Sequence, residues 1–91
     1  MKSHTQISTA EAARIAKRLL NHWKHKFEVA ETEADFTIFM PDATIQLIPQ
    51  PDALLVSIDS TLEDLSHLEQ VVLDHLNRMA QQEFTATWQH Q

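Results

Sequence analysis

The stretch F-T-I-F-M-P-D-A-T-I-Q-L-I-P-Q-P-D-A-L-L-V-S-I, residues 36–58, decides the fold. Apolar residues recur at every second position in three runs, and prolines with neighbouring aspartates separate these runs. A period of two is typical of strands with one buried face, and Pro-Asp pairs favour turns. The stretch therefore predicts three antiparallel strands joined by short turns, with one face of the sheet on the core.

The same alternation extends the predicted sheet on both sides of this stretch. Phe27 and Val29 alternate with Glu28, which predicts an earlier strand ending near residues 31–33. Near the end of the chain, apolar residues alternate with threonines over residues 84–88, which predicts a last strand there. The sheet is thus expected to hold about five strands.

A first amphipathic helix is predicted to precede these strands. Ser8 is expected to be its N-cap, with Glu11 three positions on completing a capping box, and the helix is expected to reach about Lys26. Its apolar stripe recurs at every fourth residue: Ile15, Leu19 and Trp23.

A second amphipathic helix is predicted between the last two strands. Residues 61–64, T-L-E-D, form an acidic capping box at its start, and the helix is expected to end near residues 81–82. Its apolar positions recur at spacings of three and four: Leu65, Leu68, Val72, His75, Leu76 and Met79. The predicted fold is α+β, in the order α-β-β-β-β-α-β, with a mainly antiparallel sheet and both helices on one face. A single domain is expected to span residues 1–91.

The composition excludes several classes of protein. The chain has no cysteine, which excludes disulfides, thiolate metal sites and cysteine nucleophiles and favours a reducing compartment. It also has no glycine, which excludes the Walker loop and the dinucleotide-binding fingerprint. The N-terminus lacks an apolar signal-peptide region, and no apolar run approaches the length of a membrane span. A cytoplasmic protein without membrane contact is expected.

Charge is distributed unevenly along the chain, whose net charge is −6. Residues 1–26 hold six of the seven lysines and arginines but only one of the 13 acidic residues. The acidic remainder repels a phosphate backbone, so general nucleic-acid binding is not expected. The basic segment has two interpretations. It is either a solvated helix face that balances the acidic remainder, or a surface for an anionic ligand or an acidic partner protein.

Histidines are the other candidate functional residues. His22 and His25 lie at a spacing of three, which places both imidazoles near one face of the first helix, and His75 lies on the apolar stripe of the second. A metal site would need all three. If the last strand pairs with the first predicted strand, His22 and His75 lie too far apart to share a metal ion. We therefore predict no metal site, a solvent-facing His22–His25 pair and a partly buried, hydrogen-bonded His75. The serines do not lie in a nucleophile setting, and no catalytic residue or cofactor is predicted.

The outward face of the predicted sheet is the third candidate feature. Phe39, Ile48 and Leu55 are large apolar residues among threonines on that face. A face that is half apolar suggests a homodimer or a partner sheet, whereas isolated surface apolar residues are the alternative.

Two motifs at a long separation resemble a bacterial family, the domain-of-unknown-function family 2218. They are His22-Trp23-x-His25-Lys26-Phe27 and Val71-Val72-x-x-His75-Leu76-x-Arg78-x-Ala80, followed by Glu83 and Trp88. The resemblance covers nearly the whole chain, and it departs in the turns, where family members usually have glycines.

This resemblance implies a small stand-alone protein or a domain appended to siderophore-interacting flavoproteins. It implies a role in siderophore or iron handling, with no established reaction. The matched positions are the candidate ligand- or partner-binding residues: His22, Trp23, His25, Lys26, His75 and Arg78. Two function classes stay open. The first is an accessory binding domain, and the second is a small histidine-dependent enzyme or metalloprotein using His22, His25 and His75.

Overall fold

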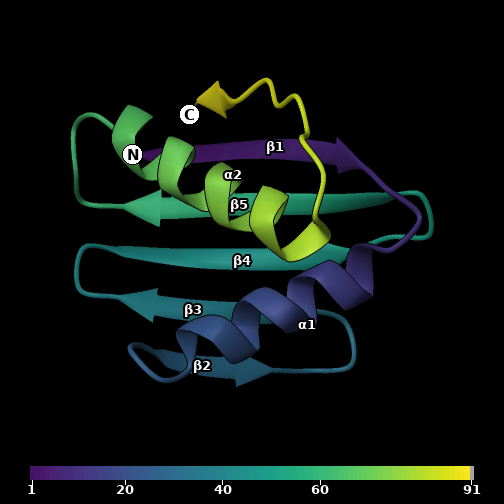
Figure 1. Cartoon of the computed structure of the whole chain (residues 1–91). Helices are drawn as coiled ribbons and strands as arrows, with labels where there is room; N and C mark the ends of the chain where they lie inside the picture. The colour runs from purple at the N-terminus through teal and green to yellow at the C-terminus, as the bar shows by residue number, and fades with distance from the viewer. Residues whose placement is uncertain (91) are drawn as a thin grey trace.

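The computed structural model describes residues 1–90 as a six-stranded antiparallel sheet with two helices on one of its faces (Figure 1). The predicted α+β class is therefore confirmed. The strand order in the sheet is β2-β3-β4-β5-β1-β6. The elements are β1 (Lys2–Ser8), α1 (Ala12–Trp23), β2 (Glu28–Glu31), β3 (Phe36–Met40), β4 (Ala43–Pro49), β5 (Ala53–Ser60), α2 (Ser66–Ala80) and β6 (Gln89–His90). Within residues 1–90, neither helix is long and apolar enough to cross a membrane.

Strand β1 is the element that the sequence analysis missed, and it adds a sixth strand before the first helix. It pairs antiparallel with β5, from Lys2 opposite Asp59 to Ser8 opposite Ala53. Its inward-facing residues Ser3, Thr5 and Ile7 are buried. Two of these three are polar, so the strand lacks the apolar alternation that revealed the others.

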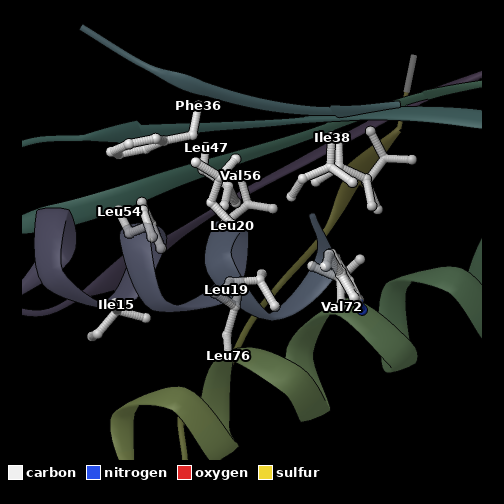
Figure 2. Packing of buried hydrophobic residues seen from close by; sticks show 14 of the residues in the cluster. Ile15, Leu19, Leu20, Phe36, Ile38, Leu47, Leu54, Val56, Val72 and Leu76 are labelled. Atoms are coloured by element: carbon white, nitrogen blue, oxygen red, sulfur yellow. The ribbon is translucent and has the colours of Figure 1, made fainter. Parts of the chain in front are cut away.

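The core lies between the sheet and the two helices. In Figure 2, Leu20 of α1 points toward the sheet, and Leu19 points toward Leu76 of α2. The inward-facing residues Ile38 and Ile45 are completely buried. The first helix thus contacts both the sheet and the second helix, and all three share one core.

Both helices begin later than their predicted capping boxes. Ser8 belongs to β1, so it cannot cap α1, and Glu11 occupies the N-cap position without a side-chain hydrogen bond to the backbone of the helix. The helix ends at Trp23, and residues 24–26 form a turn. Helix α2 begins at Ser66, where Asp64 accepts hydrogen bonds from the Ser66 backbone N–H at 2.9 Å and hydroxyl at 2.6 Å.

The last predicted strand is shorter and later than expected. Residues 84–88 form no strand, and β6 contains only two residues, which pair with Ser3 and His4 of β1. The segment before β6 is held by two other hydrogen bonds. The backbone N–H of Phe84 donates to the Asn77 side chain, and the Thr5 hydroxyl donates to the carbonyl of Thr87. The partner of β6 is therefore β1, the strand that the sequence analysis missed.

A Schellman motif ends α2 without the glycine that usually occupies it. Gln81 has a φ of 58°, in the left-handed region. Its N–H donates to the carbonyl of Arg78, and the N–H of Gln82 donates to the carbonyl of Asn77. This is the hydrogen-bond pattern of a Schellman C-cap, in which a residue with a Cβ atom is strained.

We predict that Gln81→Gly stabilises the protein. Relief of the left-handed strain outweighs the extra chain entropy of glycine in the unfolded state, for a net gain of about 0.5–1 kcal/mol. Urea denaturation followed by circular dichroism measures this gain. Gln82→Gly is the matched control and should give no stabilisation, because Gln82 does not have a positive φ. A Gln81→Gly protein no more stable than the wild type would contradict the strain argument.

The stability of the protein is expected to depend on pH in the acid range, because of the hydrogen bonds that Asp64 accepts at the start of α2. Hydrogen bonds from the Ser66 hydroxyl and backbone N–H lower the pKa of Asp64. A carboxyl whose folded pKa lies below its unfolded value of about 3.9 stabilises the fold above that value. This contribution is lost as pH falls through the folded pKa. Asp64→Asn should therefore lose less stability than the wild type between about pH 4 and pH 2, as measured by thermal unfolding. An Asp64→Asn protein that loses as much stability as the wild type over this range would contradict the expectation.

Candidate functional site

Helices α1 and α2 lie side by side and run in opposite directions (Figure 1). An Nη atom of Arg18 donates to the carbonyl of Met79 at 3.0 Å, and the rings of His22 and His75 lie 5.5 Å apart between their centroids. The prediction that His22 and His75 lie far apart is therefore wrong. It assumed that the last strand pairs with the first predicted strand, whereas the last strand pairs with β1 at the opposite edge of the sheet.

His75 is half-buried and hydrogen-bonded, as expected. Its Nδ1 lies 2.7 Å from the carbonyl oxygen of Val71, one helical turn earlier. A carbonyl oxygen only accepts, so Nδ1 carries the proton, and in the neutral ring Nε2 keeps its lone pair. No hydrogen bond to Nε2 exists within residues 1–90, and none of their buried side-chain nitrogen or oxygen atoms lacks a partner. Nε2 therefore reaches the surface.

The indole ring of Trp23 packs against the imidazole ring of His75. The Trp23 side chain is buried, and its ring centroid lies 4.8 Å from that of His75. Its other neighbour is Phe27, whose ring meets it edge-on at 6.1 Å. Trp23 was a candidate binding residue, but it is too enclosed to contact a ligand directly. This ring contact restricts the position and the tilt of the His75 imidazole.

The remaining candidates are exposed and lie close to the two histidines in the sequence, with Lys26 four residues after His22 and Arg78 three residues after His75. Lys26 extends over the ring of Phe27 at 5.5 Å, and Arg78 lies next to Met79, whose carbonyl binds Arg18. His25 is exposed, and no ring contact joins it to His22 or His75 in the described part of the chain. Residues 1–90 also contain no group of three or more His, Cys, Asp or Glu side chains placed to hold a metal ion.

We call this surface the helix seam. It consists of Arg18, His22 and Lys26 from the α1 side and of His75 and Arg78 from the α2 side. Arg18 was not among the candidates from the sequence, although its place four residues before His22 puts it on the same helix face.

Two of the three lysines and arginines of α1 form ion pairs with carboxylates. Arg14 pairs with Glu11 at 2.9 Å, and Lys17 pairs with Glu31 at 2.5 Å. No salt bridge within residues 1–90 involves the seam residues Arg18, Lys26 or Arg78. The positive charge that stays available on α1 is thus concentrated at its contact with α2.

The cavities lie elsewhere. A cavity of about 530 Å³ lies on the opposite face of the sheet, where Ile48 and Leu55 line it together with Thr85 and Thr87 from the segment before β6. No seam residue lines this cavity, and the histidine pair lies at the surface, since His22 is exposed and His75 is half-buried. An open surface suits an ion, a charged group or a partner protein better than a reaction that must exclude water.

The outward sheet face carries the predicted apolar residues in two separate places. Ile48 and Leu55 are direct cross-strand neighbours, whereas Phe39 pairs with Thr44 near the other end of the strands. Phe39 is 42% exposed. Self-association through this face stays a prediction, and it rests on a smaller continuous apolar surface than the sequence suggested.

A buried polar cluster was missed by sequence reasoning. The hydroxyl of the fully buried Ser3 donates to the carboxylate of Glu69, which is also bonded to the His90 ring at 2.6 Å. Here the carboxylate, not the imidazole, is the central group, and the hydroxyl is enclosed. The cluster therefore lacks the geometry of a hydrolytic triad. It joins β1, α2 and β6.

The fold and the site define a small two-layer α+β domain with a paired-histidine contact between its helices. The chain belongs to the bacterial family described as "Uncharacterized protein conserved in bacteria (DUF2218)", which matches residues 4–89. This finding confirms the family to which the two histidine motifs pointed.

The chain is also similar to a solved structure, the NMR structure of PA4090 from Pseudomonas aeruginosa. The two are 41% identical, with a TM-score of 0.81, over 97% of this chain and 94% of that one. No curated protein matches the chain.

The tautomer of His75 is a testable consequence of this geometry. We expect neutral His75 to carry its proton on Nδ1, because the Val71 carbonyl accepts it. Long-range ¹H–¹⁵N correlation spectra of the imidazoles distinguish protonated from unprotonated ring nitrogens. His25 is the control and should show no such preference for Nδ1–H. A His75 ring protonated on Nε2 would contradict the argument.

Proposed function

We propose that this protein is an accessory binding domain whose helix seam binds carboxylate or phosphate groups. These groups belong either to a small anionic ligand or to the acidic surface of a partner protein. The observation that supports the proposal most directly is the contact of His22 with His75. It joins the two histidine motifs into one surface, flanked by Arg18, Lys26 and Arg78.

The chemistry of the seam suits an anion. Guanidinium groups bind carboxylates and phosphates through two parallel hydrogen bonds, and an imidazole that gains a proton becomes a further cationic donor. The protein as a whole is acidic, with a net charge of −6. An anion is therefore repelled by most of the surface and is attracted to the seam, which favours selective encounter.

A link to siderophore or iron handling is the more specific part of the proposal. It rests on the resemblance to family members that are appended to siderophore-interacting flavoproteins. A ferric siderophore with anionic groups is one ligand that the seam suits, and the acidic surface of a reductase is one partner.

A histidine-dependent enzyme or metalloprotein is the second candidate, and the His22–His75 contact is the observation that favours it. Two features place it second. His25 does not join the pair in the described residues, and His22 is exposed to solvent, so that water is not excluded from a reaction there. The buried Ser3 hydroxyl, the one serine held by a buried carboxylate, is enclosed away from substrates.

We predict that the double substitution Lys26→Gln and Arg78→Gln weakens anion binding about fivefold at low ionic strength. Exposed charge interactions are each about 0.3–1 kcal/mol and are screened by salt. The measurement is an NMR titration of the ¹⁵N-labelled protein with citrate, inorganic phosphate and a Ga³⁺ tris-catecholate complex, an anionic and diamagnetic analogue of a ferric siderophore. A poly-glutamate peptide is the fourth probe and represents an acidic protein surface.

Lys2→Gln combined with Arg14→Gln is the matched control. It removes the same charge from β1 and from an ion-paired position of α1, away from the seam, and should leave the affinity unchanged. A response to the small anions alone identifies a small-ligand site, and a response to the peptide alone identifies a partner surface. The proposal is overturned if no probe shifts the resonances of His22 and His75, or if the control weakens binding equally.

A further inference from the structure

We propose that His22 and His75 together bind one divalent transition-metal ion through their Nε2 atoms, in a site open to solvent. This site is distinct from the three-histidine site considered from the sequence, because His25 takes no part in it. It does not depend on the proposed anion binding, and it can be measured in the absence of any anionic ligand.

The separation of the two rings fits a shared ion. An imidazole nitrogen binds zinc at about 2.0–2.1 Å, which places the ring centroid about 3.2 Å from the ion. Two such rings at angles of about 109–120° have centroids about 5.2–5.5 Å apart. The centroids of His22 and His75 are 5.5 Å apart, and their planes are tilted by 48°. The observed centroid separation therefore lies at the upper end of the range expected for two imidazoles that share one ion.

The hydrogen bonding of His75 prepares it as a ligand. Histidines that bind metals donate their other ring N–H to a carbonyl or carboxylate, which fixes the tautomer and the ring orientation. The Val71 carbonyl has this relation to Nδ1 of His75, at 2.7 Å, and Trp23 packs against the ring. The lone pair of Nε2 is thus held in place before any ion arrives.

His22 supplies the second, adjustable ligand. Its side chain is exposed, and no hydrogen bond within residues 1–90 holds its ring. It can turn about its side-chain bonds to direct Nε2 toward the ion at little cost. One fixed ligand and one mobile ligand permit binding without rearrangement of the core.

The ligand set determines the kind of ion. Two neutral imidazoles without thiolates or carboxylates suit Cu²⁺, Ni²⁺ and Zn²⁺, with Cu²⁺ bound most tightly, whereas Mg²⁺ and Ca²⁺ require oxygen ligands. In the described part of the chain no third side chain completes the coordination. Water or an added anion fills the remaining positions. The exposed cations Arg18, Lys26 and Arg78 oppose the binding of a metal cation, and this repulsion is reduced by solvent and by added salt.

The test is a titration of the full, tag-free chain with Cu²⁺ and Zn²⁺ by isothermal titration calorimetry in a non-coordinating buffer. We expect the first equivalent of metal ion to bind more tightly than any later one. His22→Gln should raise the Kd of this first equivalent by at least about tenfold. His25→Gln is the matched control, since it removes an exposed histidine three residues away and should leave the Kd unchanged. Electron paramagnetic resonance of the Cu²⁺ complex should show two imidazole nitrogens in the wild type and one in His22→Gln.

The second variant is His75→Gln, checked for folding by circular dichroism. In a folded His75→Gln protein the same equivalent should be lost. Equal weakening by His22→Gln and His25→Gln identifies an adventitious surface site and overturns the proposal, as does a first equivalent that survives both His22→Gln and His75→Gln. If no anionic probe binds the wild-type protein in the earlier titrations while the Cu²⁺ equivalent is present, the proposed function alone is rejected.

Discussion

Burial of one face of a wide sheet is the constraint on which the rest of the structure depends. Ile38, Ile45 and Ile58 lie in one row across β3, β4 and β5 and are completely buried. Burial of each contributes about 1.5–3 kcal/mol. Five neighbouring strands about 4.8 Å apart span about 20 Å, whereas a helix with its side chains is about 10–12 Å wide. Two helices side by side are therefore needed to cover this face of the sheet.

The histidine contact follows from this arrangement and from the order of the strands. Strands β1 and β5 are antiparallel neighbours, and each is followed by a helix that returns across the same face. The two helices consequently run in opposite directions, which sets residue 22 of α1 beside residue 75 of α2. The candidate site is thus produced by the same packing that forms the core.

The sequence predicts the parts of this molecule whose pattern reflects burial, and it fails where burial is polar. The central strands alternate apolar and polar residues because one face meets the helices, so they were found. Ser3 and Thr5 are just as buried in β1, but their hydroxyls are satisfied by Glu69 and by the carbonyl of Thr87. Those partners lie more than 60 residues away, and no local pattern reveals them. Because β1 was missed, the last strand was expected to pair with the first predicted strand, and the predicted distance between His22 and His75 was therefore wrong.

The two nitrogens of His75 distinguish a structural from a functional histidine. A histidine that serves the core alone has both ring nitrogens satisfied by the protein, since an unpaired buried nitrogen costs about 1–3 kcal/mol. His75 satisfies Nδ1 within its own helix, at the Val71 carbonyl, so it requires nothing from α1 to be stable there. Its Nε2 is left at the seam beside His22. Its position on the apolar stripe therefore explains why the ring is half-buried, and Nε2, which reaches the surface, is the ring nitrogen that no protein group occupies within residues 1–90.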